Sequence, residues 1–376
     1  MFFMDTKGNE SMRKKPVMQN RWIGMIVVLA AAIVTTIAGC SNPVGPTLKD
    51  QAKLTWTIDT IADLTPQTIL THLWGSSPNN VYAVGFSSSG KGQMYRYNGK
   101  VWTKIPFTAL EGGPIQGSVE ISDMCGFNAN DVWVVGQRID SLNQVTHISY
   151  NSSVIANWNG STWREYPAGG DGLAWISGLA PNDIWASGGG VVYHYNGSAW
   201  QKSTIPIPPQ GMAFETIAEV APNDVYTIGT INDVTPPADT GSYFLYHFDG
   251  SSWSIVDSVI ATSTYVSPIT FGEKLFAVGG HLYTSWGEGI QEFTGSGWTT
   301  ISNDTRILFL GGNSPDNLFG VGSYGAVDWY NGSTWQEINV GASTSIAMYS
   351  VWTDGSQTFI VGNDNSGYKT YIYHGH

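Results

Sequence analysis

Short stretches in which apolar and polar residues alternate, each ending in glycine, recur along the chain. VYAVG at residues 81–85 is a clear copy, and an Asn- or Asp-rich corner precedes most copies. Alternation over this length is typical of a half-buried β-strand, and Asn and Asp favour turns because their side chains bond their own backbone. Seven such strands are predicted, and they end at Gly85, Gly136, Gly188, Gly229, Gly279, Gly322 and Gly362.

A second pattern follows these strands: an aromatic residue, Asn-Gly or Asp-Gly, and a tryptophan shortly after, as in YNGSTW at residues 330–335. Asn-Gly and Asp-Gly favour tight hairpins, because both central residues can adopt positive φ. The pattern therefore predicts a hairpin whose second strand begins at the tryptophan. It occurs six times, including a degraded copy, and its tryptophans are Trp102, Trp163, Trp200, Trp253, Trp298 and Trp335.

The missing seventh tryptophan strand lies at the other end of the chain. Residues 54–61 (LTWTIDTI) contain Trp56 and precede the first glycine-ended strand without a partner. At the carboxyl end, residues 368–373 (YKTYIY) supply one strand and no hairpin follows. A ring of small sheets must close to avoid exposed edges. We therefore predict an all-β fold, a seven-bladed β-propeller of four-stranded blades over residues 53–376, closed by the N-terminal strand in the last blade.

Each blade is expected to begin with an apolar strand near the axis, such as residues 71–76 (THLWGS). The turns between its first and second strands and between its third and fourth strands then share one face, and are short. The remaining connections share the opposite face, called the loop face below. They are predicted to be irregular and to carry function, as loops on rigid scaffolds do. They include residues 106–120, 137–153, 206–214, 230–242 and 280–289.

These motifs resemble known propeller repeats. The glycine-ended strand, the aromatic third strand and the tryptophan of the fourth strand are similar to the kelch type. They resemble still more closely poorly characterised bacterial repeats of the form NDVWAVG…HYNGxxW, found in secreted and lipid-anchored proteins. The double glycine of kelch occurs only at Gly279-Gly280 and partly at Gly188-Gly189. The NGSTW turn also differs from the sialidase Asp-box, so neither family's enzymatic activity is implied.

The N-terminus has the pattern of a secretory signal. Lys14, Lys15 and Arg21 precede an apolar run that ends in Ile-Ala-Gly-Cys at residues 37–40. This order of basic, apolar and small residues is typical of a cleaved signal, and its ending resembles the lipobox of bacterial lipoproteins. We expect a signal peptide over residues 1–39, lipidated Cys40, and a linker over residues 40–52. The alternative is a transmembrane anchor, since 18 residues could just span a bilayer.

Such lipidation would place the protein in the bacterial cell envelope, outside the cytoplasm. Ser41 resembles the residue found in lipoproteins sorted to an outer membrane, where the cell has one. A formal net charge of −12 argues against a nucleic-acid partner, whose phosphates need a basic surface. Two cysteines cannot form a disulfide framework, and Cys125, on an inner strand, is interpreted as a small core residue.

Exposed aromatic residues beside carboxylates on the loop face are the candidate ligand contacts, because rings and hydrogen-bond acceptors together suit sugars or peptides. The histidines show no metal-binding spacing, since His194 and His247 occupy matching repeat positions; neither a metal nor a cofactor is expected. The predicted ligand-binding residues are Asp171, Asp233, Asp239, Tyr265, Trp286, Glu288 and Tyr324.

A lipid-anchored module that binds a protein or a glycan is the function that the sequence favours. No nucleophile or paired-carboxylate pattern stands out. The alternative is a hydrolase or lyase acting on polysaccharide, which would need two carboxyl groups about 5–10 Å apart at the channel mouth. A third possibility is a scaffold within an envelope complex, which would need a large permanent interface.

Overall fold

The computed structural model describes residues 50–61, 68–87, 92–142, 149–206, 211–233, 240–260, 271–364 and 369–376. The chain divides into the units Met1–Gly45 and Pro46–His376, and all described residues belong to the second. Cys40 and the predicted signal segment lie outside the described residues. Within the described part, no helix has the length and apolar character needed to cross a membrane.

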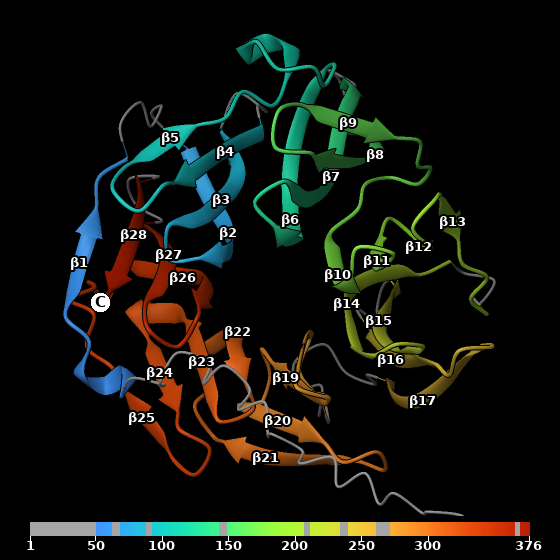
Figure 1. Ribbon diagram of the computed structural model, residues 1–376. Helices are drawn as coiled ribbons and strands as arrows, with labels where there is room; N and C mark the ends of the chain where they lie inside the picture. Colours follow the sequence, from blue (N-terminus) through green and yellow to red (C-terminus); the bar gives the residue numbers. More distant parts are fainter. Residues whose placement is uncertain are drawn as a thin grey trace, which may run out of the picture. The chain divides into compact units, whose positions relative to one another are not determined.

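The described residues form seven four-stranded antiparallel sheets arranged in a ring, which confirms the predicted seven-bladed β-propeller (Figure 1). Apolar side chains fill the spaces between neighbouring sheets; Tyr82 and Val84 of one blade, for example, pack with Val132 and Val134 of the next. The strands are β2(Thr68–Ser77), β3(Asn80–Ser87), β4(Gly92–Tyr97) and β5(Trp102–Lys104) in the first blade; β6(Ser118–Asn128), β7(Asp131–Leu142), β8(Ser149–Trp158) and β9(Trp163–Tyr166) in the second; β10(Trp175–Ala180), β11(Asp183–Gly188), β12(Val191–Tyr195) and β13(Trp200–Lys202) in the third; β14(Ala213–Ala221), β15(Asp224–Asp233), β16(Thr240–Phe248) and β17(Trp253–Ile260) in the fourth; β18(Lys274–Val278), β19(His281–Ser285), β20(Ile290–Phe293) and β21(Trp298–Ser302) in the fifth; β22(Ile307–Ser314), β23(Asn317–Gly322), β24(Val327–Tyr330) and β25(Trp335–Glu337) in the sixth; and β26(Ile346–Thr353), β27(Thr358–Asp364), β28(Lys369–Gly375) and β1(Trp56–Asp59) in the seventh.

The N-terminal strand closes the ring, as predicted. β1 pairs antiparallel with β28, so that Trp56 lies opposite Gly375 and Asp59 opposite Ile372. Beyond the strand, the backbone N–H of His376 donates to the carbonyl of Thr55, and the N–H of Thr55 donates to His376, each at 3.1 Å. The first and last segments of the propeller thus share one sheet, and β28 presents no free edge.

All seven predicted tryptophans are the first residues of the outermost strands. Three of their rings contact an aromatic residue of the neighbouring blade edge to face: Trp102 lies 6.2 Å from Phe359, Trp200 lies 5.6 Å from Trp133, and Trp253 lies 5.7 Å from Trp185. Trp102 is only 2% exposed. Each of the seven tryptophans belongs to an apolar cluster that joins two adjacent blades.

The six predicted hairpins differ in one respect from the prediction. Their glycines have positive φ, 90° at Gly99 for example, but the residues before them do not. Instead, the Asn98 side chain accepts hydrogen bonds from the N–H groups of Lys100 and Val101 at 3.1 and 3.0 Å. The Asn or Asp of this motif therefore acts through its side chain, which caps the turn, and only the glycine needs a left-handed backbone.

The hairpin and the Asn- or Asp-rich corner contact each other within a blade. A β-carbon added at Gly197 would lie 2.7 Å from that of Asn182, and one added at Gly250 would lie 2.8 Å from that of Asn223. In the fifth blade, where both motifs are degraded, nothing lies within 4 Å of such an atom at Gly295. The two sequence motifs recur together because one packs against the other.

The fifth blade corrects the strand assignment made from the sequence. Its KLFAV segment, predicted as a second strand ending at Gly279, is the innermost strand β18. Gly279 and Gly280, with φ of 59° and 82°, form the turn into β19, where the other blades have their polar corner. Residues 281–285 are therefore a strand, although the sequence placed them in a loop.

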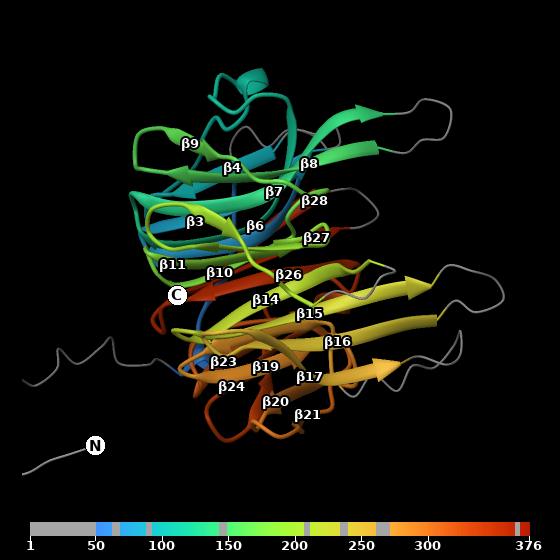
Figure 2. The same ribbon diagram turned by 90° about the vertical axis from the view of Figure 1, so that its right-hand side faces the viewer.

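Two further predicted loops are largely strands. The hairpin β7–β8 continues its pairing to Leu142 and Ser149, and β15–β16 continues to Asp233 and Thr240. In Figure 2 these hairpins project from the same side of the propeller. Residues 137–153 and 230–242 thus make the second and fourth blades longer than the other five. Their cross-strand hydrogen bonds continue past the point where the middle strands of the other blades end.

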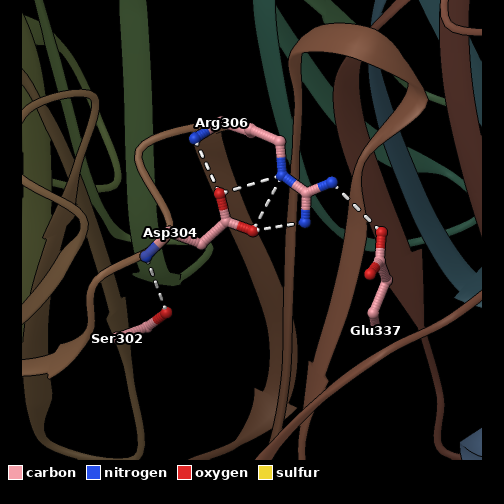
Figure 3. A network of polar contacts seen from close by, with 4 residues as sticks. All are labelled: Ser302, Asp304, Arg306 and Glu337. Carbon is pink, nitrogen blue, oxygen red and sulfur yellow. Dashed lines mark hydrogen bonds and ion pairs between the residues drawn. The ribbon is translucent and has the colours of Figure 1, made fainter.

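A polar cluster fixes the connection between the fifth and sixth blades (Figure 3). The guanidinium of Arg306 contacts the carboxylate of Asp304 at 2.6 Å through Nη2 and that of Glu337, on β25, at 3.1 Å through Nη1. Asp304 also accepts from the Arg306 N–H, and its own N–H donates to Ser302. Arg306 holds the pKa of Asp304 below its ordinary value. This cluster ties β21 and β22 to an outer strand on the loop face.

Candidate functional site

The inner strands of all seven blades meet at the mouth of a central channel on the loop face. A cavity of about 320 Å³ opens there. Most lining residues belong to the beginnings of inner strands, because these strands start at the loop face and run along the channel wall. The lining residues used below are His72 on β2, Glu120 on β6, Trp175 on β10, Glu215 on β14, Lys274 on β18, Trp286 after β19, Phe309 on β22 and Tyr349 on β26.

Lys274 lies among aromatic rings in this cavity. Its Nζ is 4.6 Å from the ring centroid of Trp175 and 5.5 Å from that of Trp286, within the range of cation–π attraction. Among the described residues, none accepts a hydrogen bond from Lys274 Nζ or forms an ion pair with it. Burial lowers the pKa of Lys274, while Glu215 and Glu273 oppose that change. The ammonium thus keeps its donors available inside the cavity.

The aromatic residues around Lys274 also contact one another. Trp286 lies 5.6 Å from Phe309, edge to face, and Phe309 lies 5.9 Å from Tyr349. On the other side, His72 meets Trp175 at 5.4 Å. The mouth is therefore walled by rings from five blades, and such amphipathic surfaces are typical of ligand sites.

Trp286 has a backbone conformation that is unusual for a large aromatic residue. Its φ is +63°, a left-handed conformation that costs a residue with a side chain about 1–3 kcal/mol. Its carbonyl accepts from the Glu273 N–H at 3.1 Å, so the segment is anchored beside β18. The side chain nevertheless stays 40% exposed. Strain that places an exposed ring at a cavity is the kind found at functional sites.

Two carboxylates line the same cavity. Glu215 accepts a hydrogen bond from Thr230 Oγ1 at 3.1 Å through Oε1, and Glu120 accepts from Gln137 Nε2 at 2.7 Å through Oε2. These contacts engage one oxygen of each carboxylate. The cavity thus offers aromatic faces, acceptors from Glu120 and Glu215, and the ammonium donors of Lys274.

Deeper in the channel, a second cavity of about 450 Å³ is lined by inner strands and includes Asp123 and His72. Asp123 accepts from the N–H groups of Met124 and Ile176, and burial raises its pKa to about 7. Burial lowers the pKa of His72 to about 3, so this imidazole is neutral at pH 7. His72 Nε2 is 3.7 Å from Asp123, too far for a hydrogen bond.

Of the predicted residues whose side chains the structure describes, Trp286 alone lines the mouth. Glu288 and Asp171 are exposed and do not line it, and Tyr324, 69% exposed, lies between β23 and β24. Asp233 ends β15, and its side chain is not described; Tyr265 and Asp239 lie outside the described residues.

The repeat histidines bond to the polar corner, as their matching positions suggest: His194 contacts Asp183 at 2.7 Å and His247 contacts Asp224 at 2.8 Å. No group of three or more His, Cys, Asp or Glu side chains suited to a metal ion occurs in the described part of the chain. Cys125 packs against an apolar cluster between the second and third blades.

Lys274, Trp175 and His72 were missed from the sequence. The signal that could have found them is their position at or near the start of an inner strand. For Lys274 this signal was hidden, because its strand was assigned to the second position of the blade.

No family model and no curated protein matches this chain. Solved propellers do. YCF48 bound to D1 peptide has a TM-score of 0.51 at 13% identity, over 85% of this chain and 96% of that chain. A catalytically inactive virginiamycin B lyase from Staphylococcus aureus with quinupristin has a TM-score of 0.57 at 11% identity, over 86% and 100%. The WD40 propeller domain of Doa1 has a TM-score of 0.54 at 9% identity, over 85% and 97%. At these identities the likeness establishes the propeller fold.

Proposed function

We propose that this protein is a lipid-anchored binding module of the bacterial cell envelope, and that the channel mouth on its loop face binds a protein or a glycan. One observation carries the binding proposal: rings from five blades surround a lysine without a polar partner among the described residues, and a strained, exposed Trp286 stands at the opening. The anchor rests on the basic and apolar segment that ends at Cys40.

Two solved propellers with this fold are described together with another molecule: YCF48 with D1 peptide, and the lyase with quinupristin. The fold can therefore support either binding or catalysis, and fold alone does not decide between them. Glu120 and Glu215 keep a polysaccharide-cleaving activity open as the alternative, because both line the mouth.

The binding proposal can be tested by capture from envelope extract with residues 46–376. We expect the wild type to capture a partner and Trp286→Ala to capture at least about tenfold less of it, as for aromatic hot spots. Val101→Ala is the control, because Val101 is 54% exposed and lies in the hairpin before Trp102, on the face opposite the mouth. Circular dichroism must show that each variant is folded.

The double variant Glu288→Ala/Tyr324→Ala asks whether the other exposed residues predicted from the sequence extend the site. Equal capture by the wild type and by Trp286→Ala would contradict binding at the mouth. Cleavage of a polysaccharide by the wild type, lost in Glu215→Gln, would instead favour the enzymatic alternative.

A further inference from the structure

We propose that the mouth binds a neutral sugar residue, a terminal or internal unit of an uncharged glycan. This inference rests on the proposed function and names the ligand class of the same site. It follows from three properties of the cavity: the balance of its charges, the chemistry of its walls and its size.

The charges disfavour a ligand of either sign. Lys274 is the one cationic side chain among the described residues that line the mouth, and it already occupies the space between Trp175 and Trp286. A ligand ammonium or guanidinium would meet this charge where the rings would otherwise attract it. An anionic group beside Lys274 would share the cavity with the carboxylates of Glu120 and Glu215, and like charges at short range in a partly buried site repel strongly.

The walls offer what a pyranose needs. Its hydroxyl groups both donate and accept hydrogen bonds: they can donate to the carboxylate oxygens of Glu120 and Glu215 that the contacts described above leave unengaged, and accept from Lys274 Nζ. Its C–H face can lie against an aromatic ring, and Trp286 is the most exposed ring of the mouth. Lys274 would gain the acceptor that it lacks among the described residues, which offsets part of the cost of its burial.

The cavity is small. Its volume of about 320 Å³ is near the lower end of the range for small-molecule sites, about 300–1,000 Å³. It therefore suits one ring-sized group at a time. The remainder of a longer glycan would lie across the loop face.

The full chain should be purified in a polyoxyethylene detergent, which carries no sugar, and first screened for binding on an array of neutral oligosaccharides. The affinity of each oligosaccharide that binds is then measured by isothermal titration calorimetry. Oligogalacturonate is the anionic comparison and a lysine-rich peptide the cationic one. We expect a neutral oligosaccharide to bind and neither charged probe to compete. Trp286→Ala should weaken binding at least about tenfold and Lys274→Met about tenfold. Val101→Ala, on the opposite face, should weaken it less than twofold.

Each other outcome overturns the inference in a distinguishable way. If a charged probe binds and Trp286→Ala abolishes its binding, the ligand class is wrong and the site stands. If the oligosaccharide binds equally to Trp286→Ala, the site is wrong. If nothing on the array binds while envelope capture still depends on Trp286, the ligand is a protein. If capture is also independent of Trp286, the proposed function fails as well.

Discussion

Two carboxyl groups on inner strands, those of Glu219 and Asp123, are buried, and their protonation is coupled to folding. Glu219 on β14 is 1% exposed, accepts from the Leu179 N–H of the neighbouring blade at 2.9 Å, and leaves its Oε1 without a partner among the described residues. Burial, and then Asp183, raise its pKa from 4.5 to about 8. The folded chain therefore binds this proton more tightly than the unfolded chain does.

This difference predicts a pH-dependent stability that Glu219→Gln removes. Since the pKa is raised in the folded state, the contribution of Glu219 is full below about pH 4.5 and falls as the pH rises to about 8. Glutamine stays neutral and can still accept from Leu179. The variant's advantage in urea unfolding should thus grow from pH 5 to pH 8.5 by a few kcal/mol, since one pKa unit corresponds to about 1.4 kcal/mol.

Asp123, whose pKa is also raised, is present in both proteins, so its titration cancels in the comparison. A stability difference that stays constant between pH 5 and pH 8.5 would show that Glu219 is ionised in the folded protein throughout this range.

At the scale of the element, the blade depends on the contact between its hairpin and its polar corner. Gly250 and Gly295 occupy the same hairpin position in neighbouring blades, with φ of 90° and 84°. A β-carbon at Gly250 would lie 2.8 Å from that of Asn223, whereas one at Gly295 would meet nothing within 4 Å. The two glycines thus separate the cost of the backbone from the cost of the contact.

Replacing each glycine by alanine should therefore give different losses of stability. Gly295→Ala should cost about 1–2 kcal/mol for the left-handed backbone alone. Gly250→Ala should cost about 2–5 kcal/mol, because overpacking adds about 1–3 kcal/mol to the cost of the backbone. Urea unfolding of the two variants measures the difference. Equal losses would mean that the corner at Asn223 moves to accommodate the added β-carbon without a measurable loss of stability.

At the scale of the whole molecule, the proposed anchor determines where the propeller acts. The chain has two cysteines, Cys40 and Cys125, and only Cys40 follows a signal-like segment. A single buried acyl chain holds a protein weakly, whereas several hold it firmly, because each buried methylene contributes about 0.8 kcal/mol.

We therefore expect an alkyne-tagged fatty acid supplied to cells to label the wild type and Cys125→Ser, but not Cys40→Ser. The wild type and Cys125→Ser should also remain in the membrane fraction. Labelling that persists in Cys40→Ser would contradict lipidation at this position. Membrane retention of an unlabelled, uncleaved chain would favour the transmembrane alternative.

The number of blades, the closure of the ring and the position of the interblade tryptophans could be predicted from the sequence. Each depends on local chemistry repeated along the chain: alternation that makes a strand, Asn or Asp with glycine that makes a turn, and a tryptophan placed at the start of the next strand. Trp286 could be found in the same way, as an aromatic residue in a connection of the loop face.

Only the tertiary structure decided what surrounds Trp286. His72, Trp175 and Lys274 are separated by about a hundred residues each and meet because the inner strands of different blades converge on one axis. Predictions from the sequence were also wrong for the lengths of β7–β8 and β15–β16 and for the first strand of the fifth blade, because these depend on which strand pairs with which. Local patterns specify the repeat, but the channel mouth exists only where the repeats come together.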